Sequence, residues 1–164
     1  MNQKLKSKTI YLLGLLFTPM FFLFAEETKT LVVGDTLPNI SYTNQFEEIS
    51  PLPENTTKVL FMADMDASKI IHPLLEKEGK GFLEKYNAVL ISDIHRMPSL
   101  ITKFVALPKM KSYPYNIRLV REEGLSNPFP RTKGSVTLIL LQSGRVKKIS
   151  ESNMEAEIRE FLIK

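Results

Sequence analysis

Two apolar runs place tighter limits on the fold of this chain than any other feature of its sequence. Residues 59–63 and 88–91 are continuously apolar, which is typical of strands buried on both faces of a sheet. Each run is followed by apolar residues at helical spacing, at residues 70–86 and at residues 98–107. Strands that alternate with helices predict an α/β fold in which neighbouring strands run parallel.

The remaining segments add antiparallel strands to this arrangement. Residues 26–52 hold turn residues between short extended runs and predict an N-terminal β-hairpin. Residues 117–120 predict a short strand, and residues 135–141 and 145–149 predict a hairpin around the turn at residues 142–144. We therefore predict one three-layer α/β/α domain, with a central mixed sheet covered by helices on both faces and an N-terminal β-hairpin extension.

Three helices are expected around this sheet. The first should kink at Pro73 and fray at Gly79 and Gly81. The last should begin with a capping box formed by Ser152 and Glu155. The expected core face of the second helix is Leu100, Ile101, Phe104, Val105 and Leu107, and that of the last is Met154, Ile158, Phe161 and Leu162.

The first 25 residues differ from the rest and predict a secretory signal of a bacterial protein. Three lysines precede residues 10–25, a mostly apolar run that contains Pro19 and is followed by two glutamates. A comfortable membrane-spanning helix needs about 20 apolar residues, more than this run offers. We predict a signal peptide over residues 1–25 and an exported, periplasmic domain over residues 26–164. The alternative is an uncleaved anchor in the inner membrane, with the domain facing the periplasm.

The charge of the chain excludes a nucleic-acid partner. The chain has 22 basic and 18 acidic residues, a formal charge of +4. Three of the lysines belong to the N-terminal segment, which contains no acidic residue, so the charge without that segment is +1. Binding to nucleic acid depends on a clearly basic surface, and a nearly neutral domain does not provide one.

The chain contains no cysteine. This excludes thiol-based oxidoreductase and peroxidase activity, and also thiolate ligation of zinc or of an iron–sulfur cluster. The sequence also has neither a G-x-G-x-x-G motif nor a Walker loop, so we expect no cofactor. The stability of the domain must come from packing without disulfides.

Three segments of the sequence resemble the thioredoxin-like superfamily, in particular its peroxiredoxin and TlpA-like branch. They are VGDTLP at residues 33–38, the run at residues 59–63 ahead of a proline-containing helix, and LILLQSGRV at residues 138–146. The resemblance covers nearly all of residues 30–164 and implies a thioredoxin-like fold. Cysteine-free periplasmic relatives, the YtfJ-like proteins, are similar in their organisation.

The same resemblance indicates where a redox site would lie. In redox members, a Cys-x-x-Cys motif or a peroxidatic cysteine follows the strand that corresponds to residues 59–63. The two cysteine positions fall here on Met65 or Asp66 and on Ser68 or Lys69. Gly134 and Ser135 stand where redox members place a cis-proline. The redox mechanism is therefore not implied for this chain.

Polar side chains follow both apolar runs. Asp64 and Asp66 come after the first run, and Asp93 and His95 come after the second. The carboxyl ends of neighbouring parallel strands lie together, so these groups could surround one hard or borderline metal ion, or support hydrolysis. In the structural alternative, Asp64 or Asp66 caps the next helix, and Asp93 and His95 lie on a solvated loop.

Aromatic residues in proline-containing loops are the candidate partner-binding surface. Tyr113, Tyr115 and Phe129 lie in such loops, although ordinary turns have the same composition. His72, inside the first helix, is expected to be a partly buried structural residue. A basic stretch predicts a solvated face, or contact with anionic lipid or an acidic partner; it comprises Lys103, Lys109, Lys111, Arg118 and Arg121.

Two functions of different classes remain. The first is a non-catalytic binding or accessory protein of the bacterial cell envelope that recognises another protein. The second is a metal-binding protein or hydrolytic enzyme that uses Asp64, Asp66, Asp93 and His95. Membrane contact is expected only if the N-terminal segment is retained.

Overall fold

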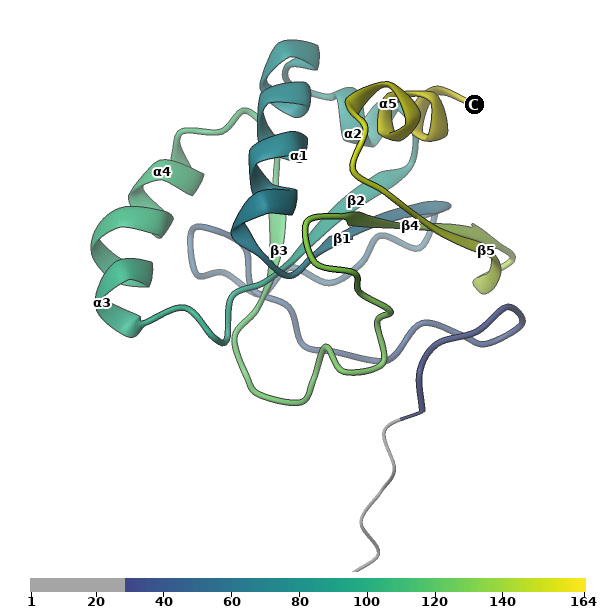
Figure 1. Cartoon of the computed structure of the whole chain (residues 1–164), viewed down its shortest axis with the longest axis horizontal. Helices are drawn as coiled ribbons and strands as arrows, with labels where there is room; N and C mark the ends of the chain where they lie inside the picture. The colour runs from purple at the N-terminus through teal and green to yellow at the C-terminus, as the bar shows by residue number, and fades with distance from the viewer. Residues whose placement is uncertain (1–28) are drawn as a thin grey trace, which may run out of the picture.

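The computed structural model describes residues 29–164. The predicted signal segment, residues 1–25, lies outside the described residues. Within residues 29–164, every helix is too short or too polar to cross a membrane. One five-stranded sheet forms the centre of the molecule, with helices above it and loops below it in the view of Figure 1.

The sheet is mixed, as predicted, with the strand order β3-β2-β1-β4-β5. Strand β2 pairs in parallel with β1 and β3, whereas β4 pairs antiparallel with β1 and β5. The strands are β1 (Lys58–Met62), β2 (Ala88–Asp93), β3 (Ile117–Val120), β4 (Val136–Gln142) and β5 (Arg145–Ser152). The two apolar runs are β1 and β2, and all five residues of β1 are buried.

The first predicted helix is two helices. Helix α1 continues through Pro73 and ends at Gly79, whose backbone N–H donates to the carbonyl of Leu75 at 3.0 Å. Gly79 and Gly81 both have φ of +83°, a conformation that glycine adopts at little cost, and they separate α1 from α2. The helical segments are α1 (Met65–Glu78), α2 (Phe82–Lys85), α3 (Ser99–Ile101), the π-helix η1 (Thr102–Ala106), α4 (Leu107–Lys111) and α5 (Glu155–Ile163).

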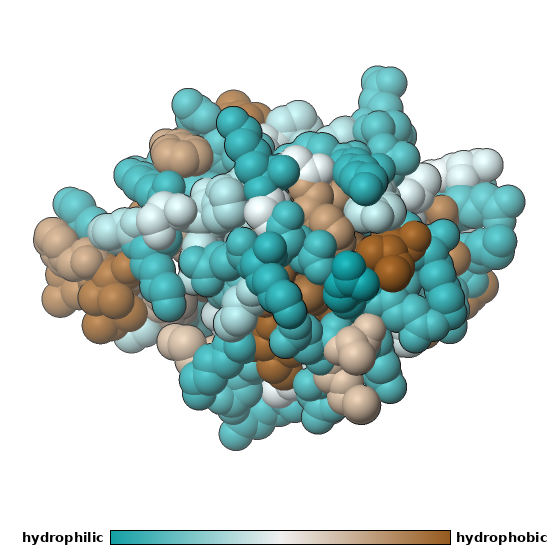
Figure 2. Space-filling model, turned by 90° about the horizontal axis from the view of Figure 1, so that it is seen from above, coloured by the Kyte–Doolittle hydropathy of each residue, from teal (hydrophilic) through white to brown (hydrophobic). Residues whose placement is uncertain are grey.

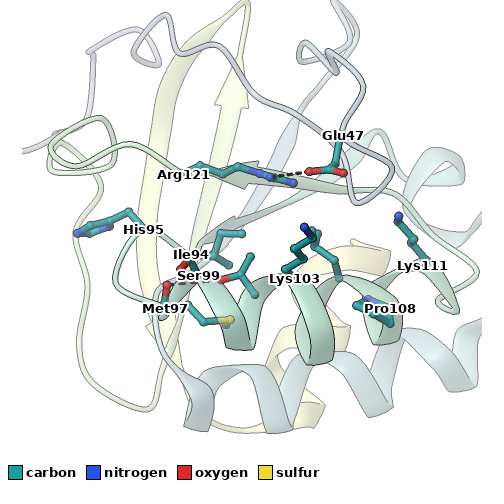
Figure 3. A pocket seen from close by; sticks show the side chains of 11 residues that line it. Glu47, Ile94, His95, Met97, Ser99, Lys103, Pro108, Lys111 and Arg121 are labelled. Atoms are coloured by element: carbon teal, nitrogen blue, oxygen red, sulfur yellow. Dashed lines mark hydrogen bonds and ion pairs between the residues drawn. The ribbon is translucent and has the colours of Figure 1, made fainter.

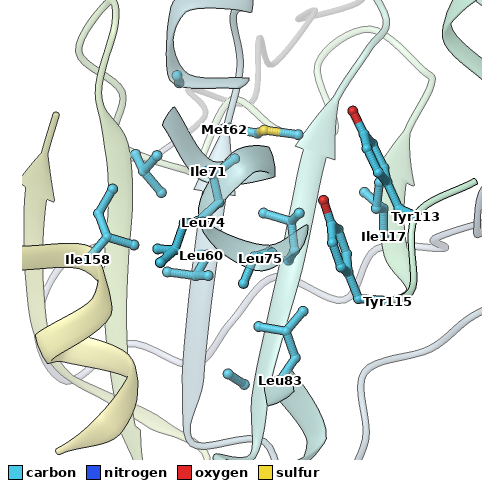
Figure 4. Packing of buried hydrophobic residues seen from close by; sticks show 14 of the residues in the cluster. Leu60, Met62, Ile71, Leu74, Leu75, Leu83, Tyr113, Tyr115, Ile117 and Ile158 are labelled. Atoms are coloured by element: carbon cyan, nitrogen blue, oxygen red, sulfur yellow. The ribbon is translucent and has the colours of Figure 1, made fainter. Parts of the chain in front are cut away.

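The helices all pack on one face of the sheet. Their buried side chains join those of the strands in one cluster, in which Ile71 of α1 and Ile158 of α5 lie against Leu60 of β1 (Figure 4). Right-handed crossovers explain this arrangement, because the β1–β2 and β2–β3 connections proceed in the same direction across the sheet.

The opposite face is covered by loops, which corrects the prediction of helices on both faces. Among the described residues, the cluster on that face contains no helical side chain. Leu31, Ile40 and Tyr42 from the N-terminal segment and Phe129 from the β3–β4 connection are buried there against the strands. The outer layer on this side is therefore built from non-helical chain.

The predicted N-terminal hairpin is also corrected. Residues 30–33 and 40–42 do not form paired strands, and the segment makes only isolated bridges. Thr36 bridges Arg145, and Thr43 bridges both Ile49 and Leu119. The backbone pairs with itself only in a short turn, where the N–H of Asn44 donates to Glu48 and that of Ser50 to Tyr42, while the apolar side chains of the segment contact the sheet face.

Gln45 closes the edge of the sheet at β3. Its side-chain amide donates to the carbonyl of Tyr115 at 2.8 Å, and its carbonyl oxygen accepts the N–H of Ile117 at 3.0 Å. Thr43 adds two backbone hydrogen bonds with Leu119. These contacts satisfy strand groups that would otherwise be open for pairing with another chain.

Ser152 does not form the predicted capping box with Glu155. It is the last residue of β5, its hydroxyl donates to Glu157 at 2.6 Å, and Met154 is the N-cap of α5. Met154 is 54% exposed, which contradicts its predicted place in the core. Ile158, by contrast, is fully buried, as is Leu162.

The predicted core face of the second helix is wrong for four of its five residues. Leu107 of α4 is buried, but the other four residues are exposed. The segment is apolar around most of its circumference, and the face that packs on the sheet is formed by Leu107 and Met110. The exposed residues are Leu100, Ile101, Phe104 and Val105.

Replacement of Gln45 tests its role at the sheet edge. In Gln45→Met the side-chain volume is nearly kept, but the Tyr115 carbonyl and the Ile117 N–H lose their partners in a buried site. We expect the free energy of unfolding, measured by urea denaturation, to fall by about 2–4 kcal/mol. Gln142→Met, at an exposed glutamine, should change it by less than about 0.5 kcal/mol. Equal effects of the two variants would contradict the assignment.

Candidate functional site

The strand ends of β1 and β2 meet the start of α1 at a hollow in the surface. Two adjoining pockets of about 340 and 220 Å³ share Ala63, Asp64, Asp93 and Arg96 in their walls. The larger also has Arg131 and Lys133, from the loop that precedes β4. We call the two together the strand-end pocket. It lies at the edge of the sheet where open α/β folds commonly bind ligands.

Asp64 is the N-cap of α1. Its Oδ1 accepts the backbone N–H groups of Asp66 and Ala67, each at 2.9 Å. Its Oδ2 accepts the N–H of Gly134, also at 2.9 Å, and so ties the loop before β4 to the helix. Burial raises the pKa of this carboxyl, but the three backbone hydrogen bonds outweigh burial and hold the pKa below its usual value. The carboxylate is ionised, and both of its oxygens accept hydrogen bonds from the backbone.

Asp93, at the end of β2, is the centre of a buried polar network. Its side chain is 3% exposed. Oδ1 accepts from His95 Nδ1 at 2.6 Å, and Oδ2 accepts from Arg131 Nη1 at 3.1 Å and from the Ser126 hydroxyl. Burial raises the pKa of Asp93, but the hydrogen bonds from Ser126 and His95 more than compensate and lower it from its usual value.

The two ring nitrogens of His95 have different roles in this network. Its Nδ1 donates to Asp93, and its Nε2 accepts from Arg96 Nε at 3.3 Å, so the neutral Nδ1–H tautomer satisfies both contacts. The Ser126 hydroxyl is bonded to Asp93 and not to the imidazole. A serine triad needs the imidazole between the hydroxyl and the carboxylate, and here the carboxylate is in the middle.

The predicted metal site is not formed. Among residues 29–164, no three histidine, aspartate or glutamate side chains are placed to hold one metal ion. Asp66 points outward and pairs with Lys69 at 2.8 Å, while Asp64 is taken up by the helix cap. The Arg131 guanidinium occupies the position beside Asp93 where a cation would bind. Asp64 caps α1, as the structural alternative proposed, whereas Asp93 and His95 lie in a buried network and not on a solvated loop, which corrects the other part of that alternative.

Ser126 and Arg131 were not predicted from the sequence. Both belong to the long connection between β3 and β4, and no local pattern marks them as partners of Asp93, 33 and 38 positions away. Arg131 also lies over the Phe61 ring, 5.2 Å from its centroid, and Phe61 stacks on Phe129 at 4.6 Å. The connection is thus held to the sheet by the two contacts with Asp93 and by the two contacts with the Phe61 ring.

The positions predicted for redox cysteines lie at the start of α1. Met65 is 62% exposed, and Ser68 lines the smaller part of the strand-end pocket. Lys69 pairs with Asp66 on the outer surface. Gly134 faces these residues from the loop before β4 with φ of +77°, and the described chain has no cis peptide bond. The hollow is thus retained without a thiol.

The predicted aromatic binding surface lies in the interior, which corrects that prediction. Tyr113, Tyr115 and Phe129 are 7%, 4% and 1% exposed. Tyr113 and Tyr115 stack on one another (Figure 4). Both also stack on His72 of α1, and the Tyr115 hydroxyl lies 2.8 Å from His72 Nδ1. Phe129 packs on the opposite face of the sheet. The rings stabilise the fold and are not available as a binding surface.

His72 is the buried structural histidine that was predicted. Burial, assisted by the charge of Lys109, lowers its pKa to about 4. The neutral ring accepts the hydroxyl proton of Tyr115, whose own pKa is raised by burial. Protonation of His72 would place a buried charge against the two stacked tyrosines.

A larger groove, of about 690 Å³, lies between β3 and the segment from α3 to α4. Lys103 and Lys111 extend from the helical side toward Arg121, which pairs with Glu47 at 3.1 Å (Figure 3). Two further nitrogens of Arg121, Nε and Nη2, are buried without a hydrogen-bond partner among the described residues. We call this the helical groove; the sequence indicated its cations as a basic stretch but not the cavity.

Removal of the Asp93 charge tests the network around it. In Asp93→Asn, Arg131 loses its ionic partner, and we expect the free energy of unfolding at pH 7 to fall by about 2–3 kcal/mol. The pKa of Asp93 is lowered in the folded state, so its carboxylate contributes to the free energy of unfolding above a pH of about 4. This contribution is lost as the pH falls through the lowered pKa of the folded state. Asp66→Asn, at an exposed ion pair, should cost less than about 0.5 kcal/mol.

The pH dependence of stability tests the state of His72. Its pKa is lowered on folding, so the stability that neutral His72 provides is complete above pH 6.5 and is lost as the pH falls toward 4. The shift corresponds to roughly 3 kcal/mol between pH 7 and pH 4. His72→Gln keeps an acceptor for Tyr115 and cannot titrate, so urea denaturation should show a smaller loss. A wild-type curve parallel to that of the variant would contradict this.

Comparisons with known proteins identify the fold. No family model matches the sequence, and no curated protein matches it. Among solved structures, peroxidoxin BcpB of Mycobacterium tuberculosis matches 81% of this chain and 95% of its own, with a TM-score of 0.54 and 12% identity. The thioredoxin domain of a thiol-disulfide oxidoreductase from Bacteroides vulgatus matches 81% of this chain and 99% of its own, with a TM-score of 0.52 and 13% identity. A thio-disulfide isomerase of Thermus thermophilus matches 81% of this chain and 96% of its own, with a TM-score of 0.50 and 18% identity. The chain therefore has a thioredoxin-like fold, built without a single cysteine.

Proposed function

We propose that this chain is a non-redox, exported binding protein of the bacterial cell envelope, and that it holds its partner at the strand-end pocket. The observation that carries the proposal is the charge of that pocket. Arg96, Arg131 and Lys133 line it, while the carboxylates of Asp64 and Asp93 are used by the helix cap and the buried network.

The absence of cysteine supports a binding function instead of disulfide exchange. Transfer of electrons between dithiol and disulfide requires a thiolate nucleophile, and no side chain of this chain can supply one. Met65 and Ser68 stand at the start of α1, and neither the thioether nor the hydroxyl forms mixed disulfides. A surface hollow at this place on the fold can still bind a polypeptide.

The electrostatics of the pocket favour a partner that carries a carboxylate. Among residues 29–164, neither Arg96 nor Lys133 takes part in an ion pair with a protein carboxylate. Arg131 is 29% exposed beside its contact with Asp93. A C-terminus or an acidic side chain entering the pocket would therefore meet three cationic donors, of which Arg131 is held in place by Asp93.

Export is supported by the sequence of the N-terminal segment. A lysine-bearing start, an apolar run at residues 10–25 and the polar residues that follow are the parts of a secretory signal. Determination of the N-terminal residue of the protein isolated from its source cells distinguishes a cleaved signal from a retained anchor.

Cross-linking from within the pocket tests the proposed function. A photoreactive amino acid at Thr132, an exposed pocket residue, should cross-link one protein reproducibly in living cells. The double variant Arg96→Glu/Lys133→Glu should lose this product, because it repels a carboxylate. The control Lys147→Glu/Lys148→Glu makes the same change of charge on β5 and should retain it. A product that survives reversal at the pocket would refute this binding site.

A further inference from the structure

Positive charge is concentrated in one stretch of the domain, whose net charge over residues 26–164 is +1. Residues 94–121 contain six cationic residues and no acidic one: Arg96, Lys103, Lys109, Lys111, Arg118 and Arg121. This stretch includes α3, η1 and α4, which form the outermost helical segment beside β3 (Figure 1). Three of the six, Lys103, Lys109 and Lys111, belong to the helical segment itself. Outside this stretch, residues 26–164 contain 13 basic and 18 acidic residues, so the segment is a cationic part of a domain that is otherwise acidic.

The same segment exposes four large apolar side chains within six residues. Leu100 is 69% exposed, Ile101 46%, Phe104 66% and Val105 58%. Brown, apolar atoms gather at the left edge of Figure 2, the side on which α3 and α4 lie in Figure 1. A cluster of this kind on a soluble domain marks an interaction surface, because single exposed apolar residues are ordinary but neighbouring ones are not.

The cations lie next to the apolar patch. Lys103 is placed over the Phe104 ring, with Nζ 5.6 Å from its centroid. On the inner side of the segment, Lys103 and Lys111 face Arg121 across the helical groove, where Glu47 is the only carboxylate in the lining (Figure 3). Helices that lie in a membrane interface have apolar side chains on one face and lysines or arginines beside them. This segment has the same combination, with a cationic groove on its inner side.

We propose that the segment from α3 to α4 is a membrane-contact element, which places Leu100, Ile101, Phe104 and Val105 in the interface of an anionic bilayer. The lysines bind lipid phosphates at the headgroup level, and the helical groove with Arg121 provides a further seat for a phosphate. This surface adjoins the strand-end pocket, because Ile94 and Met97 line both that pocket and the helical groove. The two proposals are distinguished by their readouts, which are the cross-link from Thr132 for the partner and the dye at position 105 for the bilayer.

A bilayer accounts for this surface better than a second copy of the chain. A two-fold contact through the apolar patch would bring Lys103 and Lys109 of each copy near the same lysines of the other, and like charges would oppose it. An anionic lipid surface supplies apolar chains and negative charge together. Each lysine at such a surface strengthens binding by about fivefold.

A single fluorescent label tests this contact. Because the full chain has no cysteine, Val105→Cys accepts one environment-sensitive dye in the apolar patch. Met154→Cys carries the same dye at a residue of similar exposure on α5, which lies over β4 and β5 at the other end of the sheet. The local signal reports insertion of this segment even if residues 1–28 also bind the vesicles.

With vesicles of phosphatidylcholine and phosphatidylglycerol, the dye at position 105 should shift to shorter wavelength and brighten several-fold. The dye at position 154 should not change, and vesicles of phosphatidylcholine alone should have little effect. The triple variant Lys103→Gln/Lys109→Gln/Lys111→Gln should need about 100-fold more anionic lipid for the same response. Vesicle-bound protein whose dye at position 105 stays in water would overturn the proposal. So would a response to polyglutamate without a response to vesicles, which would indicate an acidic protein instead.

Discussion

The Asp64 carboxylate connects three parts of the fold at one point. It follows β1, caps α1 through Oδ1, and holds the loop before β4 through the Gly134 N–H that Oδ2 accepts. Strands β1 and β4 are neighbours in the sheet, and α1 follows β1 directly. The hydrogen bond between Asp64 and Gly134 therefore sets the distance between the start of α1 and the loop before β4. The strand-end pocket exists because this carboxylate holds its two walls in place.

A second carboxylate does the same for the long connection between β3 and β4. Asp93 receives hydrogen bonds from Ser126 and Arg131 and is almost completely buried. Burial of a charge is unfavourable unless the group is paired and hydrogen bonded, and the network supplies these contacts. Both aspartates accept their hydrogen bonds from other groups of the protein. The cations at the mouth of the pocket therefore determine the charge of the ligand that it attracts.

Local patterns predicted the strands but not the outer surfaces. β1 and β2 are buried on both faces, so their apolar runs identify them without knowledge of their neighbours. Tyr113, Tyr115 and Phe129 were expected outside and lie inside, whereas Leu100 and Phe104 were expected inside and lie outside. In both cases the decisive contacts are with parts of the chain that are distant in the sequence. Tyr113 packs against His72 of α1, and the helical segment packs on the core with Leu107 and Met110, which leaves Leu100 and Phe104 outside. The partners of Asp93 were missed for the same reason.

The one-sided helical layer links the two proposed surfaces. Both parallel crossovers lie on one face, so the segment from α3 to α4 is the last helical element beyond α1 and has a free outer side. An apolar outer side at that place has no neighbour within residues 29–164 to cover it, and repulsion between its lysines would oppose pairing with a copy of itself. The strand-end pocket opens at the carboxyl ends of β1 and β2 and adjoins the helical groove, since Ile94 and Met97 line both. A partner in the pocket and a bilayer along the helices would therefore lie side by side, and each would limit the space open to the other.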